Sequence, residues 1–189
     1  ELFENRVKDK DWELRAKKAE AFSSNKDWKL FDVQIKFYGK DLEYIVSSER
    51  ATVNTETMDM SIHGAVKVVT SNHFEFEAEE MSFDAKNHKL YSKTKTRFIS
   101  PKDKLGARII MDSNELYTSL DLNQVEAKGD VTAIKEDRLK KMKVVSEEAI
   151  FHLDTQAAQF VNQVEIDYGT SKATGSLASL VYDESKKLF

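Results

Sequence analysis

The sequence predicts an all-β protein in which one antiparallel sheet is folded into two facing walls. Three observations predict this class: an internal repeat of about 32 residues, apolar residues that alternate with polar ones, and a change in the phase of that alternation at the same place in each unit. Of the 189 residues, 40% are hydrophobic and 33% are charged, and only six glycines and one proline are present. Such a composition is typical of a folded protein with a strongly solvated surface.

The repeat appears as pairs of segments at a constant offset. Residues 48–51 read SERA, and residues 146–149, which lie 98 positions later, read SEEA. The anchor residues of successive units are spaced by 30 to 35 positions, at Ala19, Ala51, Met81, Leu116, Ala149 and Leu180. We therefore expect about six units of two strands each.

The repeat also bears on the domain organisation. We expect a single elongated unit over residues 1–189, because the units follow one another along the whole chain. An offset of 98 residues equals about three units, so the chain also divides into similar halves, 1–103 and 104–189. The segment around Pro101, from Ser100 to Gly106, is the best candidate for the junction between them, and it is too short to be a free linker.

Each unit carries strands with one apolar and one polar face. One series that shares a parity is Met58, Met60, Ile62, Val66 and Val68. Another is Phe74, Phe76 and Ala78, which alternate with Glu75, Glu77 and Glu79. A period of two over such lengths indicates strands that are buried on one face and solvated on the other.

The parity of the apolar residues changes once within each unit. Tyr44 and Val46 occupy even positions, whereas Ala51 and Val53 occupy odd ones. The same change separates Met142 and Val144 from Ala149, Phe151 and Leu153, and it separates Ile109 and Met111 from Leu116, Leu120 and Leu122. A slip of one residue moves every later side chain to the other face unless a bulge or bend absorbs it. A bend repeated in every strand would curve the sheet into two walls with the apolar faces inside.

Helices were the alternative for two segments. Leu14 to Phe22 and Asp137 to Ala149 are rich in Lys, Glu, Ala and Leu, and either could form a helix if taken alone. The repeat places the corresponding residues of other units in strands, so we predict strands there. Polar and glycine-containing segments predict turns between the strands, at residues 25–27, 38–41, 54–56, 71–72, 85–88, 154–155 and 168–170.

The residues do not predict a catalytic centre, a metal site or a cofactor. The chain has no cysteine, and its four histidines are dispersed over different units. It carries no nucleophile elbow, phosphate-binding loop or dinucleotide fingerprint. The recurring pairs Phe83-Asp84 and Tyr182-Asp183 fit turn positions better than catalytic carboxylates. Because 33 acidic and 29 basic residues are mixed along the chain, nucleic acid is not a predicted partner.

The spacing of several residues resembles a known family. Trp12, Leu14, Ala16 and Ala19 are followed by the strand pattern Trp28, Leu30, Asp32, Val33, Ile35, Phe37 and Tyr38, and then by Ala51, by Ile62-His63-Gly64-Ala65-Val66 and by Glu80-Met81-Ser82-Phe83-Asp84. This pattern resembles the periplasmic lipopolysaccharide-transport proteins of the LptA/LptC (OstA-like) family. The first hundred residues are most similar to LptC, and Leu122 to Val131 carry the looser LptA-type repeat.

The resemblance implies an open antiparallel β-jellyroll, shaped like a taco, that holds lipid A acyl chains between its walls. It also implies that the protein stacks end to end with similar jellyrolls through its edge strands, as a non-catalytic part of a periplasmic bridge. An inner-membrane transporter complex is a further implied partner. LptC proteins usually carry an N-terminal membrane anchor. This chain opens at Glu1, so we expect a processed or truncated product, and the anchor that the resemblance implies would belong to a segment absent from this chain.

The alternation and the resemblance together predict which side chains would contact lipid. These inner-face residues are Val46, Val53, Met60, Ile62, Val66, Phe74, Phe76, Met81, Phe83, Leu122, Val144, Phe151 and Phe160. A structural envelope protein with a closed, dry core is the alternative. An open apolar groove with free sheet edges distinguishes the first function from the second.

Overall fold

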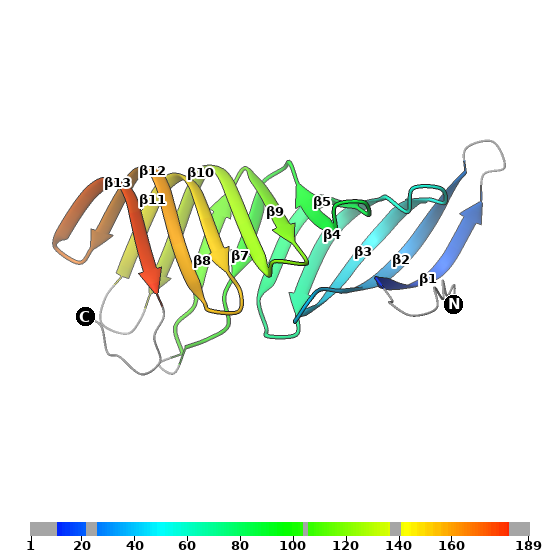
Figure 1. The fold of residues 1–189 in the computed structure, drawn as a ribbon, viewed down its shortest axis with the longest axis horizontal. Helices are drawn as coiled ribbons and strands as arrows, with labels where there is room; N and C mark the ends of the chain where they lie inside the picture. Colours follow the sequence, from blue (N-terminus) through cyan, green and yellow to red (C-terminus); the bar gives the residue numbers. More distant parts are fainter. Residues whose placement is uncertain (1–10, 22–25, 104–105, 137–140, 182–189) are drawn as a thin grey trace.

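The fold is one antiparallel sheet that is bent along its length (Figure 1). The computed structural model describes residues 11–21, 26–103, 106–136 and 141–181. Its thirteen strands are β1 (Trp12–Ala21), β2 (Asp27–Tyr38), β3 (Glu43–Asn54), β4 (Met60–Thr70), β5 (Glu75–Asp84), β6 (Lys89–Ser92), β7 (Thr96–Ile99), β8 (Ile109–Ser113), β9 (Glu115–Ser119), β10 (Gln124–Glu136), β11 (Lys141–His152), β12 (Ala157–Tyr168) and β13 (Ser171–Val181). The described residues include no helix, and hence none long and apolar enough to cross a membrane.

The strands follow one another across the sheet almost in chain order. The path runs β1-β2-β3-β4-β5-β6-β9-β10-β11-β12-β13, with β7 paired to β5 and β8, and β8 paired to β10. Strands β6 and β7 therefore behave as one long strand broken at residues 93–95, and β8 and β9 as another broken at Asn114. β1 and β13 form the opposite ends of the elongated molecule (Figure 1).

The bend lies where the sequence predicts the change of phase. Register shifts separate Ser47 from Arg50 in β3 and Val145 from Glu148 in β11. Further shifts divide β4 between His63 and Val66, β10 between Lys128 and Val131, and β12 between Val161 and Val164. Because every long strand bends at the same height, the sheet has two walls. The first wall contains Val33 to Tyr38, Glu43 to Ser47, β7 and β8; the second contains the other half of each long strand, β6 and β9.

A left-handed backbone conformation makes these bulges possible. Gly64 has a φ of 83° and the next residue, Ala65, a φ of 45°. A Cβ on Gly64 would lie 2.6 Å from the Glu49 side chain, so the neighbouring strand leaves room only for glycine. Gly129 and Asp130 repeat the arrangement in β10, with φ values of 74° and 50°.

The repeat anchors form a row across the second wall. Ala19 pairs with Leu30, Leu30 with Ala51, Ala51 with Ile62, and Ile62 with Met81. On the other side of β6 the row continues through Leu116, Ala127, Ala149 and Phe160. One unit of the repeat is thus two strands, which brings the first five anchors back to the same height. The sixth, Leu180, pairs with Ala158 and lies two residues away from the row, which reaches β13 at Ala178. Strands also occupy Leu14 to Ala21 and Lys141 to Ala149, as predicted; Phe22 and 137–140 lie outside the described residues.

The space between the walls is filled. Twelve of the thirteen predicted inner-face residues are at most 7% exposed, and Phe37 contacts Phe83 from the other wall at 4.3 Å between ring centroids. Leu122 is the exception, and its prediction was wrong: its side chain is 65% exposed. β9 ends at Ser119, so the alternation stops there, and the turn buries Asn123 instead. Met58 likewise lies in the turn before β4, with a φ of 64°, rather than on the strand.

The predicted turns lie between strands wherever they fall on described residues. Asp84 shows the turn chemistry in detail, since its two carboxylate oxygens accept hydrogen bonds from the backbone N–H and the side-chain amide of Asn87 at 3.0 and 2.7 Å. These bonds lower the pKa of the Asp84 carboxyl. Tyr182-Asp183, the corresponding pair, lies outside the described residues.

Candidate functional site

The walls touch each other along part of the free rim, at the side opposite the bend. The side-chain amide of Asn123 donates to Asp41 Oδ2 at 3.0 Å, and the backbone N–H of Lys40 donates to the Leu120 carbonyl at 3.2 Å. Further along, the Asn72 side-chain amide donates to the Leu153 carbonyl at 2.9 Å. In the first place the β2–β3 turn of the first wall meets the β9–β10 turn of the second, and in the other the β4–β5 turn meets the β11–β12 turn. In each case the second turn lies five strands further along the sheet order than the first.

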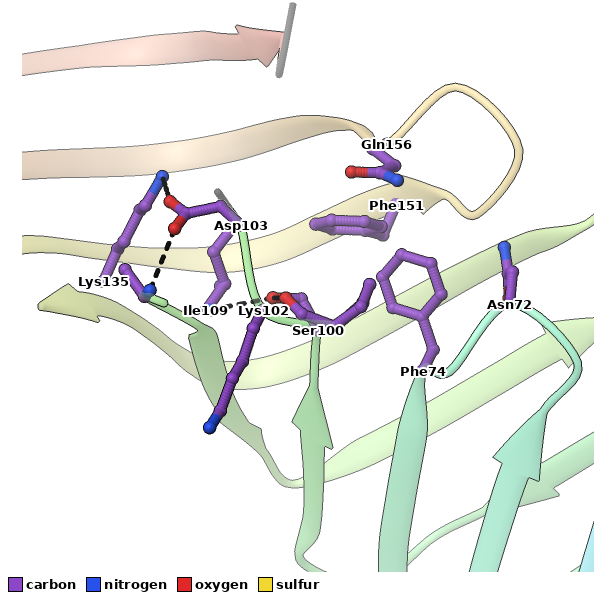
Figure 2. A pocket seen from close by; sticks show the side chains of 11 residues that line it. Asn72, Phe74, Ser100, Lys102, Asp103, Ile109, Lys135, Phe151 and Gln156 are labelled. Atoms are coloured by element: carbon purple, nitrogen blue, oxygen red, sulfur yellow. Dashed lines mark hydrogen bonds and ion pairs between the residues drawn. The ribbon is translucent and has the colours of Figure 1, made fainter. Parts of the chain in front are cut away.

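A pocket opens beside the last of these contacts. Its volume is about 300 Å³, and it lies between the segment after β7 and the turn after β11 (Figure 2). Its lining consists of Asn72, Phe74, Ser100, Pro101, Lys102, Asp103, Ala107, Ile109, Lys135, Phe151 and Gln156. The volume is at the lower end of the range of about 300–1,000 Å³ for ligand pockets.

The apolar side of the pocket belongs to an aromatic cluster that continues into the core. Phe74 and Phe151 come from opposite walls, and their ring centroids lie 5.7 Å apart in an edge-on arrangement. Phe98 lies behind both rings, at 5.4 Å from Phe74 and 4.8 Å from Phe151. Ile109, which is half-buried, adds an aliphatic surface. Within the described residues, the pocket is therefore a place where the apolar interior comes close to the surface.

The polar side of the pocket carries more positive than negative charge. Lys135 Nζ lies 2.9 Å from Asp103 Oδ2, and the other oxygen of Asp103 accepts from the Ala107 N–H at 2.9 Å. Ser100 Oγ accepts from the Ile109 N–H at 2.9 Å, which fixes the segment against β8. Lys102 is exposed, and Figure 2 shows its amino end pointing away from the two aromatic rings. The apolar rings and two cations suit a ligand with both an alkyl part and a negative charge.

The described residues offer no alternative catalytic or metal centre. No three His, Cys, Asp or Glu side chains in the described ranges lie close enough together to hold a metal ion. The charged side chains form pairs on the outer faces, such as the two-point contact of Arg97 with Asp112 at 2.8 and 3.2 Å. Glu75 lies between Lys67 and Arg108, and the hydrogen bond from Lys67 lowers the pKa of the Glu75 carboxyl.

Residues 7–108, more than half of the chain, match the family of LptC-related lipopolysaccharide-assembly proteins. The chain belongs to this family. Its members are non-enzymatic, and the membership gives the chain a role in lipopolysaccharide transport in the periplasm. No curated protein matches the sequence significantly.

A solved structure shares the fold of this LptC-family chain. It is the crystal structure of LptH from Pseudomonas aeruginosa, described as the LptA homologous periplasmic component of the conserved lipopolysaccharide transport device. The TM-score is 0.55 at 11% sequence identity, and the match covers 68% of this chain and 94% of LptH. At that identity the similarity concerns the fold, and it confirms the predicted β-jellyroll.

The pocket includes few of the predicted lipid contacts of this LptC-family chain. Phe74 and Phe151 line it, and the structure brings them together from opposite walls. The remaining buried members of the predicted set lie in the closed interior: Val46, Val53, Met60, Ile62, Val66, Phe76, Met81, Phe83, Val144 and Phe160. Sequence reasoning missed the polar lining, in particular Lys102, Asp103 and Lys135. The signal for Lys102 and Asp103 was the irregular segment around Pro101, which the repeat places at the junction between halves, and no pattern in the sequence indicated Lys135 on β10.

The two ends of the sheet are its other exposed feature. Within the described residues β1 pairs only with β2, and β13 only with β12. Most side chains of β13 are exposed, including those of Ala173 and Leu177. The backbone of each edge strand can therefore accept a further strand.

Proposed function

We propose that this LptC-family chain holds an acyl chain of lipopolysaccharide in the pocket beside Phe74 and Phe151 and transfers it within a stack of similar jellyrolls. The observation that supports this function is that the apolar interior reaches the surface at this pocket, beside Lys102 and Lys135. Each buried methylene contributes about 0.8 kcal/mol. A pocket of about 300 Å³ has room for part of one chain, so the remainder of the lipid stays outside.

The cations supply the preference for a charged lipid. Lys135 is held by Asp103, whereas Lys102 extends from the same segment into solvent. A phosphate group of lipid A at the pocket entrance gains from both charges, and one carboxylate, that of Asp103, offsets them in part. The salt dependence of binding follows, because exposed charges are screened over about 8 Å at physiological ionic strength.

We propose further that the edge strands β1 and β13 join this chain to neighbouring jellyrolls. Addition of a strand satisfies the free backbone N–H and C=O groups of an edge and continues the apolar inner face into the next protein. Both strands have unpaired edges within the described part of the chain. An inner-membrane transporter complex is the partner that the family implies for one of these ends.

Binding of lipid A by native mass spectrometry, with a phospholipid as the competitor, tests the proposed site. Ile109 lines the pocket, whereas its neighbour Ile110 is 41% exposed on the outer face of the same strand. Ile109→Asp should weaken lipid A binding at least tenfold, and Ile110→Asp should leave it unchanged. Lys102→Glu should reduce the preference for lipid A over phospholipid. Equal binding by both isoleucine variants would place the ligand elsewhere.

One observation favours the alternative of a structural protein with a dry core. The interior between the first six strands is filled, and the rim above it is closed by hydrogen bonds. Absence of lipid A binding by the folded protein in the same experiment would support this alternative. The pocket would then be a surface hollow without a ligand.

A further inference from the structure

The closed part of the rim raises a question about passage, since a filled interior leaves no room for an acyl chain. We call this part the rim seal, and it consists of Gly39, Lys40, Asp41 and Asn72 from the first wall and Leu120, Asn123 and Leu153 from the second. It covers the interior on the N-terminal side of the pocket. Passage of an acyl chain through this part of the interior belongs to the proposed function, on which the inference below rests.

The rim seal is held by few interactions. All strand pairings of the described residues join neighbours within the bent sheet, so the walls meet at the rim through individual hydrogen bonds. Among the described residues these are the Lys40–Leu120, Asn123–Asp41 and Asn72–Leu153 bonds at 3.2, 3.0 and 2.9 Å, and a longer contact joins Asp11 to His88 at 4.0 Å. Such bonds open more easily than a ladder of paired strands, because each can break without its neighbours.

Two buried polar atoms at the seal, one on Asn123 itself and one on Tyr44 beneath it, have no hydrogen-bond partner among the described residues. The Tyr44 hydroxyl belongs to a side chain that is 0% exposed, and the Asn123 Oδ1 atom to one that is 2% exposed. Tyr44 lies against the seal, because a Cβ on Gly39 would be 3.0 Å from its ring and 2.5 Å from the Leu120 carbonyl oxygen. Burial raises the pKa of the Tyr44 hydroxyl, as expected where water is excluded.

Unpaired buried polar groups destabilise the closed form relative to an open one. When the walls separate, water or a ligand can donate to Asn123 Oδ1 and can donate to or accept from the Tyr44 hydroxyl. Opening would also uncover the apolar residues next to Tyr44, among them Phe37 and Val46. The surface so exposed has an apolar floor with two hydrogen-bonding groups at its edge.

We infer that the rim seal is a gate, and that Tyr44 and Asn123 form a second ligand site beneath it for the hydroxyl or ester groups at the base of an acyl chain. In the closed form the ligand reaches only the pocket at Phe74 and Phe151. In the open form the acyl chain lies along the first half of the interior, and its polar end replaces the missing partners of Tyr44 and Asn123.

The absence of cysteine from the chain allows a direct test. Asp41→Cys with Asn123→Cys places two thiols on side chains whose ends are in contact at 3.0 Å, and a disulfide or a short bis-thiol reagent then locks the seal. Ser61→Cys with Ser82→Cys is the matched control, because these residues pair within one wall. Locking should slow lipid A association at least tenfold relative to the same double variant in its reduced form, which lacks Asn123 in both states, whereas oxidation of the control pair should have no effect.

Two single variants test the gate in opposite directions. Gly39→Ala puts a methyl group against the Leu120 carbonyl, which should hold the walls apart and accelerate lipid A association several-fold. Tyr44→Phe removes the unpaired hydroxyl, so its melting temperature should be no lower than that of the parent, while lipid A affinity falls about fivefold, the equivalent of one hydrogen bond. Tyr117→Phe, whose hydroxyl bonds to Glu115 at 2.6 Å on the outer face, should leave the affinity unchanged.

Amide hydrogen exchange tests the gate without lipid. The Lys40 amide should exchange at least tenfold faster than the paired Val46 amide, and locking the seal should remove the difference. Equal protection of both amides in the unlocked protein, or unchanged lipid A association after locking, would overturn the inference. If no variant binds lipid A while Lys40 still exchanges rapidly, the gate stands and the proposed function fails.

Discussion

The side chain of Phe151 provides the sharpest test of how the interior is packed. It is 2% exposed and contacts Phe98 and Phe74 at centroid distances of 4.8 and 5.7 Å. Truncation of a buried phenylalanine to alanine costs about 3–5 kcal/mol, because both the transfer free energy and the contacts across the resulting cavity are lost. For a chain of this length each kcal/mol lowers the melting temperature by roughly 2–4 °C. Phe151→Ala should therefore melt about 6–20 °C below the parent.

Urea unfolding followed by circular dichroism measures this loss, with the slope of the transition as a check that the unfolded state is unchanged. Leu122→Ala is the control, since its 65% exposed side chain should change the free energy of unfolding by no more than about 0.5 kcal/mol. A loss below about 1 kcal/mol for Phe151→Ala at an unchanged slope would refute the reasoning. It would mean that the ring lies in an open groove in solution rather than in a packed aromatic cluster.

Three further predictions concern the bulges, the outer charges and the turns. Gly64→Ala should destabilise the protein by more than about 1 kcal/mol, because φ is 83° and Glu49 occupies the space of the new methyl group. Gly175→Ala is the control and should be tolerated, since no atom lies closer than 3.8 Å to the added Cβ. Thermal melts of the two variants test the difference. Glu75→Gln should lose the stability that comes from the lowered pKa of Glu75. That stability is fully present above the ordinary pKa of 4.5 and is lost as the pH falls through the lowered pKa of the folded state, so urea midpoints of parent and variant should differ at pH 7 and converge at acidic pH. Asp84→Ala should lower the melting temperature by a few degrees through loss of the two Asn87 bonds, and an unchanged melting temperature would contradict the assigned turn role.

Much of the fold was predictable because it depends on local patterns. The alternation around Met60 and Ile62 requires a strand with one buried face, and the shift of parity between Val46 and Ala51 requires a bulge. Both follow from backbone geometry within a few residues. The prediction failed at Leu122, where the strand ends three residues earlier and parity no longer describes the direction of the side chain.

The candidate site was much less predictable. Phe74 and Phe151 were in the predicted set, but so were ten residues that lie in the closed interior. The parity of a residue within its strand tells whether its side chain faces the space between the walls or the solvent. It contains no information on whether that space is filled. The charged lining, with Asp103 bonded to Lys135, comes from residues 32 positions apart, which is about one unit of the repeat, but the alternation does not indicate that these two side chains meet.

The sequence by itself determined an antiparallel sheet of bent two-strand units, its inner and outer faces, and the similarity to the LptC family that the comparison confirmed. Only the tertiary structure decided which turns meet at the rim. The β2–β3 turn contacts the β9–β10 turn because the walls are rotated relative to each other, and twist accumulates over many strands. The total twist is a property of the whole sheet. It determines where the rim is closed, at Asp41 and Asn72, and where a pocket opens, beside Phe74 and Phe151.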